Sequence, residues 1–138
     1  MNILKVLTER RKIGNIGERA AARYLKRKGY KILKRNYVPL DHEIDIIAEN
    51  REYTAFIEVK TRTEGCENPN EARPASAVTP RKQRGIITAA KYFLGTHKVG
   101  IKARLDIIEV YLDKRKKVQK ILHLEGAFDW SSAHDKNY

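Results

Sequence analysis

Two neighbouring stretches decide the fold of this 138-residue chain: Glu43-Ile44-Asp45-Ile46-Ile47-Ala48 and, after a short polar turn, Tyr53-Thr54-Ala55-Phe56-Ile57-Glu58-Val59-Lys60-Thr61. Both are rich in β-branched and aromatic residues and are bounded by turn-forming residues, which predicts two strands. The turn between them, Glu49-Asn50-Arg51, favours an antiparallel hairpin. If Asp45 pairs with Glu58, the hairpin is centred on residues 51 and 52, at this turn.

Asp45 and Glu58 are acidic residues inside strands that are otherwise apolar. Ionised groups avoid such positions unless they are paired or bind a metal. Side chains alternate between the faces of a strand, so Glu58 and Lys60 share a face, and the hairpin register brings Asp45 close to them. Two carboxylates bind a hard cation such as Mg²⁺, and an adjacent lysine can orient an attacking water, a combination that suits hydrolysis of a phosphodiester. Ordinary ion pairs are the alternative that the spacing leaves open.

Outward from the hairpin, the patterns predict a helix on each side and three more strands. The first helix is expected at 15–28, with Asn15 as its N-cap, and the second starts with Thr79 as N-cap and Pro80 in the first turn. The other strands are expected at 30–38, 103–112 and 118–124, and residues 64–78 predict a long loop. This order predicts a mixed α/β fold with a central sheet flanked by helices. We expect one domain over residues 1–130 and a frayed tail over 131–138.

The chain is strongly basic, with 29 Lys and Arg against 17 Asp and Glu and a net charge of +12. The first 35 residues hold twelve of these basic side chains and only two acids. A surface this basic favours a polyanion, which is nucleic acid, an acidic membrane or an acidic protein, and the concentration in the first 35 residues favours a phosphate-facing surface. A solvated helix face is the alternative for any single cluster. The candidate nucleic-acid contacts are Arg11, Lys12, Arg19, Arg62, Lys82 and Arg84.

Composition also excludes several classes of protein. A single cysteine, Cys66, cannot form an internal disulfide, and four scattered histidines do not make a Cys-rich zinc site. There is no apolar run near 18 residues, and the first twelve residues are too polar for a signal peptide. We therefore expect a soluble protein of the reducing cytoplasm with no membrane partner. Asp106 is expected to pair with a neighbouring arginine.

Several stretches together resemble the family called UPF0102, or YraN-like proteins, within the restriction-endonuclease-like PD-(D/E)xK superfamily. The resemblance covers about residues 10–128. Ile44 stands where the name of the superfamily motif has proline. The stretches that carry the resemblance are Gly14-Asn15-Ile16-Gly17-Glu18, Glu43-Ile44-Asp45-Ile46-Ile47, Phe56-Ile57-Glu58-Val59-Lys60-Thr61-Arg62 and Arg104-Leu105-Asp106.

The resemblance implies an αβββαβ core similar to that of archaeal Holliday-junction resolvases. It also implies Mg²⁺ or Mn²⁺ held by Asp45 and Glu58, with Lys60 at the water and Glu18 completing the site from the first helix. From the residues alone, Glu18 has another interpretation, a capping box with Asn15. The function expected is a metal-dependent endonuclease acting on DNA, with branched or structured DNA as one candidate substrate and a homodimer as one candidate assembly. The alternatives are a nucleic-acid-binding module that keeps the fold and cuts nothing, and a ribosome- or protein-binding factor.

Overall fold

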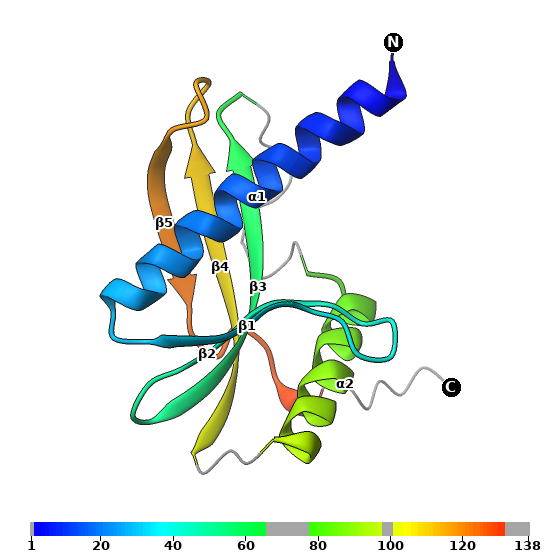
Figure 1. The fold of residues 1–138 in the computed structure, drawn as a ribbon, viewed down its shortest axis with the longest axis vertical. Coiled ribbons are helices and arrows are strands. Elements are labelled where there is room, and N and C mark those ends of the chain that lie inside the picture. Colours follow the sequence, from blue (N-terminus) through cyan, green and yellow to red (C-terminus); the bar gives the residue numbers. More distant parts are fainter. Residues whose placement is uncertain (1, 66–77, 98–100, 132–138) are drawn as a thin grey trace.

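The computed structural model describes residues 2–65, 78–97 and 101–131, and its elements follow the predicted order α-β-β-β-α-β-β (Figure 1). Most of the loop predicted at 64–78 and all but the first residue of the predicted tail lie outside the described residues. The elements are α1 (Ile3–Arg27), β1 (Lys31–Tyr37), β2 (Ile44–Glu49), β3 (Tyr53–Thr63), α2 (Pro80–Thr96), β4 (Lys102–Leu112) and β5 (Val118–Leu124).

The five strands form one sheet in the order β1-β2-β3-β4-β5. Only β3 and β4 run parallel, and the other neighbours are antiparallel. A parallel pair needs a crossover connection, and the crossover here contains α2. The mixed α/β fold class with an αβββαβ core is therefore confirmed.

The hairpin of β2 and β3 has the predicted register, since Ile46 pairs with Ile57 and Ala48 with Ala55. Asn50 fixes the turn: its side-chain oxygen accepts hydrogen bonds from the backbone N–H groups of Glu52 at 2.9 Å and of Tyr53 at 2.7 Å. An Asx turn of this kind needs only one residue type at one position, which explains why the turn could be located from the sequence.

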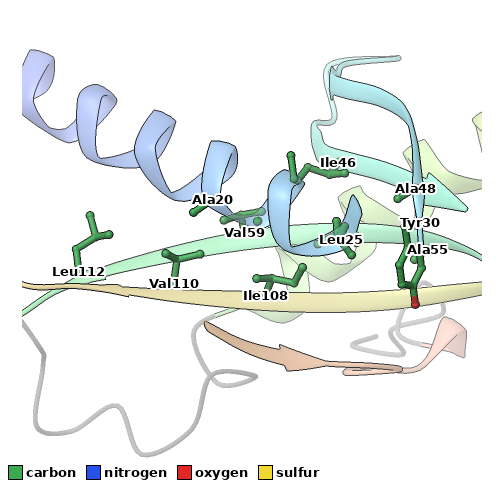
Figure 2. Packing of buried hydrophobic residues seen from close by; sticks show 13 residues of the cluster. Ala20, Leu25, Tyr30, Ile46, Ala48, Ala55, Val59, Ile108, Val110 and Leu112 are labelled. Carbon is green, nitrogen blue, oxygen red and sulfur yellow. The ribbon is translucent and has the colours of Figure 1, made fainter. Parts of the chain in front are cut away.

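The central strand β3 is buried on both faces over its first half, between α1 on one side and α2 on the other. Ala55 and Ile57 face α1, and Phe56 between them faces α2. Figure 2 shows Ala20 of α1 over Val59 of the sheet, with Leu25 further along the helix in the same cluster. The core therefore has two apolar layers separated by the sheet.

The helix α2 begins as predicted, with Thr79 as N-cap accepting a hydrogen bond from the backbone N–H of Lys82 at 3.1 Å and with Pro80 in the first turn. Its buried face packs Phe93 edge-on against Phe56, with ring centroids 5.8 Å apart. This packing holds the C-terminal half of α2 against the sheet.

The predicted start of the first helix is wrong. Helix α1 begins at Ile3 with Asn2 as N-cap, so it is twelve residues longer at its N-terminus than the predicted 15–28. Its first turns project past the sheet (Figure 1), where Ile3, Leu4 and Leu7 are exposed. Glu9 ties this part to the β4–β5 turn through Lys116 at 2.8 Å. The residues before Ile13 form no buried apolar stripe, so the helical pattern on which the prediction relied begins only at Ile13.

Candidate active site

The candidate site lies at a step in the sheet. Pairing between β2 and β3 ends at Ile46 and Ile57, whereas β3 continues beside β4 to Thr63. Beyond this last pair, the next residue is Asp45 on β2 and Glu58 on β3. Asp45 Oδ2 accepts a hydrogen bond from the backbone N–H of Val59 at 2.8 Å, which holds the two predicted acids next to each other.

A cavity of about 560 Å³ opens at this step, between α1 and β3. Its lining brings together three of the predicted catalytic residues, Glu18, Asp45 and Glu58, and one predicted phosphate contact, Arg62. Glu58 is only 4% exposed, and Asp45 and Glu18 are half-buried. One oxygen of Glu18, Oε1, is buried and accepts no hydrogen bond from any residue in the described part of the chain. The cavity therefore collects carboxylates, and one oxygen of Glu18 has no hydrogen-bond partner in the described residues.

Glu18 reaches the cavity because α1 lies unusually close to β3. A Cβ atom on Gly17 would fall 1.8 Å from Oγ1 of Thr61, so only glycine permits this approach. The capping-box interpretation of Glu18 is wrong, because Asn15 and Glu18 lie in the middle of α1 and not at its start. Glu18 is instead the contribution of α1 to the cavity.

The acids of the site repel one another. Burial raises the pKa of Asp45 to about 7, the negative charges of Glu58, Glu18 and Glu43 add to the shift, and the Val59 N–H opposes it. Burial also raises the pKa of Glu18 above its usual value, although Arg35 opposes that shift. A raised carboxyl pKa means that the site disfavours the charged form as it stands. A bound cation would favour the charged carboxylates and lower these pKa values.

Two lysines approach Glu58, and both contact the same oxygen. Lys60 Nζ lies 4.0 Å from Oε1, and Lys82 Nζ, from the first turn of α2, lies 3.0 Å from it. Burial lowers the pKa of Lys82, but attraction to Glu58 outweighs this effect, so the pKa lies above its usual value. Lys60 therefore contacts Glu58, but neither lysine is among the residues that line the cavity.

The donor set fits a hard divalent cation. Within the described ranges, no three His, Cys, Asp or Glu side chains are close enough to enclose a metal ion. Mg²⁺, however, is usually bound through one or two carboxylates and keeps several waters or takes phosphate oxygens. Asp45 and Glu58 meet that requirement, and the unpartnered Oε1 of Glu18 could accept a hydrogen bond from such a water.

The other predicted nucleic-acid contacts are spread over the surface. Arg11, Lys12 and Arg19 are exposed on α1, and none of them lines the cavity. Arg84 is half-buried on α2. Arg62 lines the cavity but also pairs with a buried acid, Glu109, at 3.6 Å.

Sequence reasoning missed two residues of this region. Arg10 lines the cavity from α1, and it would have been found if the helix had been started at Asn2, because Arg10, Gly14 and Glu18 follow one another at intervals of four. Glu109 is 2% exposed on β4, directly paired in register with Lys60. It is an acid in an apolar strand, the same signal that identified Asp45 and Glu58.

Taken together, the fold and the cavity define an α/β protein with an αβββαβ core and an acidic site at the step in its sheet. The chain belongs to the family described as "Uncharacterised protein family UPF0102", whose model matches residues 17–110. The predicted family is thereby confirmed.

Relatives of similar length carry the same family name. A UPF0102 protein of Chlorobaculum parvum is 45% identical over 121 residues, covering 84% of this chain and 91% of the relative. One of Caldanaerobacter subterraneus is 40% identical over 118 residues, covering 84% and 93%. These names state no activity, so function is argued from the site.

No helix in the described part of the chain is both long enough and apolar enough to span a membrane.

Proposed function

We propose that this protein is a metal-dependent endonuclease that hydrolyses phosphodiester bonds in DNA. The observation that carries the proposal is the meeting of Glu18, Asp45 and Glu58 around one cavity, with two lysines on Glu58. Acids that served only to bind nucleic acid would repel its phosphates. The carboxylates repel phosphate unless they hold a cation, so we infer that they bind one.

Each side chain has a part in this proposal. Asp45 and Glu58 would hold Mg²⁺ or Mn²⁺, which when bound neutralises phosphate charge and makes a water more acidic. Lys60 orients the attacking water and stabilises charge on the phosphate oxygens. Glu18, through its unpartnered Oε1, holds a proton of that water. Arg62 contacts a neighbouring phosphate from the cavity wall.

DNA is the substrate that the charge of the chain favours. The net charge of +12 supplies the long-range attraction, and Arg11, Lys12 and Arg19 on α1 supply exposed phosphate contacts. Branched or structured DNA remains one candidate substrate. A two-fold homodimer would place two such cavities on two strands, as cutting a junction requires.

Metal binding can be tested without knowing the substrate. Mn²⁺ should broaden the amide NMR signals around Asp45 and Glu58 in the wild type and leave them sharp in Asp45→Ala. Asp129→Ala, a change at an exposed acid outside the cavity, is the matched control and should broaden as the wild type does. Absence of local broadening in the wild type would remove the basis of the metal site.

Catalysis is tested at Lys60. We expect Lys60→Ala to lose cleavage of DNA by about 10²-fold or more while keeping DNA affinity within a few-fold, because the lysine acts on the water and not on docking. Cleavage assays on branched, single-stranded and duplex DNA with Mg²⁺ and Mn²⁺ give the measurement. If Lys60→Ala cuts as fast as the wild type, the catalytic assignment is wrong.

The binding module without catalysis is supported by one contact: Lys82 already neutralises Glu58 at 3.0 Å without any metal. Under that reading, Asp45→Ala should tighten DNA binding by removing repulsion, and no product should form with any substrate. Under the nuclease proposal, Asp45→Ala abolishes cleavage and the enhancement of DNA binding by metal.

A further inference from the structure

The shorter of the two lysine contacts on Glu58 does not come from the strand motif. Lys82 Nζ is 3.0 Å from Glu58 Oε1, against 4.0 Å for Lys60 Nζ. A cation from α2 thus stands closest to a carboxylate that is 4% exposed.

The two lysines differ in how easily each can move its ammonium group away from Glu58. Lys60 lies two residues from Glu58 on the same strand, and its side chain is 26% exposed. Lys82 reaches in from the first turn of α2 with a side chain that is 47% exposed. Its four-carbon stem can rotate into solvent without any change in the core, because the contact is made only by its end.

We propose that Lys82 is the resident counter-ion of Glu58, and that a divalent cation at Asp45 and Glu58 displaces its ammonium group toward a phosphate of the bound DNA. The inference rests on the proposed function and deepens it by assigning Lys82 as a positioning residue. It also sets an order of events, in which metal binding prepares the phosphate contact.

The charges around the site require an exchange of this kind. An ammonium and a dication that share one carboxylate oxygen repel each other strongly at contact distance. Without metal, the lysine relieves the repulsion among Glu58, Asp45 and Glu43, all of which act on Lys82. With metal bound, the positive charge of Lys82 would no longer be needed to offset these carboxylates.

The first turn of α2 gives the displaced lysine a destination. It contains Arg81 and Lys82 and no acidic residue. Backbone N–H groups at a helix N-terminus favour an anion, and cations there are unfavourable until one binds. The ammonium therefore exchanges a carboxylate partner for a phosphate partner without crossing the protein.

The first test measures metal alone. At pH 8, Lys82→Gln should bind Mn²⁺ about tenfold more tightly than the wild type, because the repelling charge is gone. Arg81→Gln removes the same charge one residue away on an exposed side chain and should change the affinity less than twofold. Lys82→Arg should restore weak binding. A gain in affinity is a readout that damage to the fold does not produce.

The second test measures duplex DNA binding by fluorescence anisotropy in a Lys60→Ala background, where DNA is not consumed. Without metal, adding Lys82→Gln should leave the affinity within twofold, since the lysine is engaged by Glu58. With Mg²⁺, the same change should weaken binding several-fold and lower the salt dependence by about one phosphate contact.

The outcomes separate this inference from the function on which it rests. If the wild type shows no local Mn²⁺ binding, the proposed function fails. If the wild type binds Mn²⁺ and Lys82→Gln binds it equally or less well, the exchange is refuted and the metal site stands. If Lys82→Gln weakens DNA binding to the same extent with and without Mg²⁺, Lys82 is a permanent phosphate contact and the exchange is again refuted.

Discussion

Asp45 and Asp106 both lie in the sheet, and their pKa values shift in opposite directions. Burial and the surrounding carboxylates raise the pKa of Asp45 to about 7. Burial acts the same way on Asp106, but hydrogen bonds from His123, Arg104 and the Gly126 N–H outweigh it and hold the pKa below its usual value. The predicted arginine partner of Asp106 is confirmed as Arg104, with two contacts of 2.8 Å. The protein thus stabilises the charged form of Asp106 and destabilises that of Asp45.

Asp45→Asn should make the metal-free protein more stable at pH 8. A carboxyl whose pKa is raised on folding costs stability as pH rises from its unfolded pKa near 4 through the folded value of about 7. Asparagine removes this cost, which is about 4 kcal/mol at most, and keeps an oxygen for the Val59 N–H. Urea unfolding at pH 8 and pH 4 measures it, and the gain should vanish at pH 4. An equal gain at both pH values would show that the carboxyl charge is not its cause.

Asp106→Asn should have the opposite effect, a loss of about 3 kcal/mol at pH 7, because it breaks a buried ion pair and removes the buried carboxylate that Arg104 contacts. A lowered pKa contributes stability that is present above the unfolded pKa and is lost as pH falls through the folded value. The difference between the variant and the wild type should therefore shrink below about pH 4. Thermal unfolding between pH 3 and pH 7 gives the measurement, and a pH-independent loss would argue against the ionic explanation.

At the scale of single residues, the acids were predictable and their surroundings were not. Asp45 and Glu58 stood out because each interrupts an apolar strand, and Glu109 could have been found in the same way. The location of Glu18 in the cavity agrees with what the family resemblance implied, whereas its local sequence suggested a helix cap. Lys82 was expected as a contact to DNA, and its ion pair with Glu58 depends on packing that no local pattern encodes.

At the scale of elements, α1 owes its position to one of its two glycines. Gly17→Ala should destabilise the protein by about 2 kcal/mol and weaken Mn²⁺ binding, because the added Cβ collides with Thr61 and pushes Glu18 away from the cavity. Gly14→Ala, where a Cβ meets nothing within 4 Å, should instead stabilise by up to about 1 kcal/mol through helix propensity.

The two glycine variants can be compared by urea unfolding, which measures stability, and by Mn²⁺ titration, which measures metal affinity. Adding Thr61→Ala to Gly17→Ala removes the oxygen that lies 1.8 Å from the new Cβ and should recover part of both losses. Equal effects of the two glycine variants would contradict a packing role for Gly17.

The elements also show where sequence patterns stop being informative. The hairpin of β2 and β3 was predictable to its register because turn and alternation agree. The start of α1 was not, because residues before Ile13 bury nothing against the sheet and leave no apolar period to read. The parallel pairing of β3 with β4 joins segments separated by a helix, so it is decided by tertiary packing.

At the scale of the whole molecule, the basic surface and the acidic cavity should be separable. Replacing Arg11, Lys12 and Arg19 together by glutamine should weaken DNA binding and lower its salt dependence by about three phosphate contacts. Mn²⁺ affinity should stay within twofold, because none of the three lines the cavity. Anisotropy titrations between 50 and 200 mM KCl would show this, and an unchanged salt dependence would place the DNA elsewhere on the surface.

The overhang of α1 divides one continuous helix into two regions of different local stability. The first turns are joined to the rest of the molecule by the exposed contact of Glu9 with Lys116, whereas the later turns pack through Leu25 and other core residues. Backbone amides should therefore exchange with solvent deuterium quickly before Ile13 and slowly beyond Gly17. Arg10 lies in the fast region, so the positive charge that it brings to the cavity is present only while these turns are wound, and bound DNA should slow their exchange.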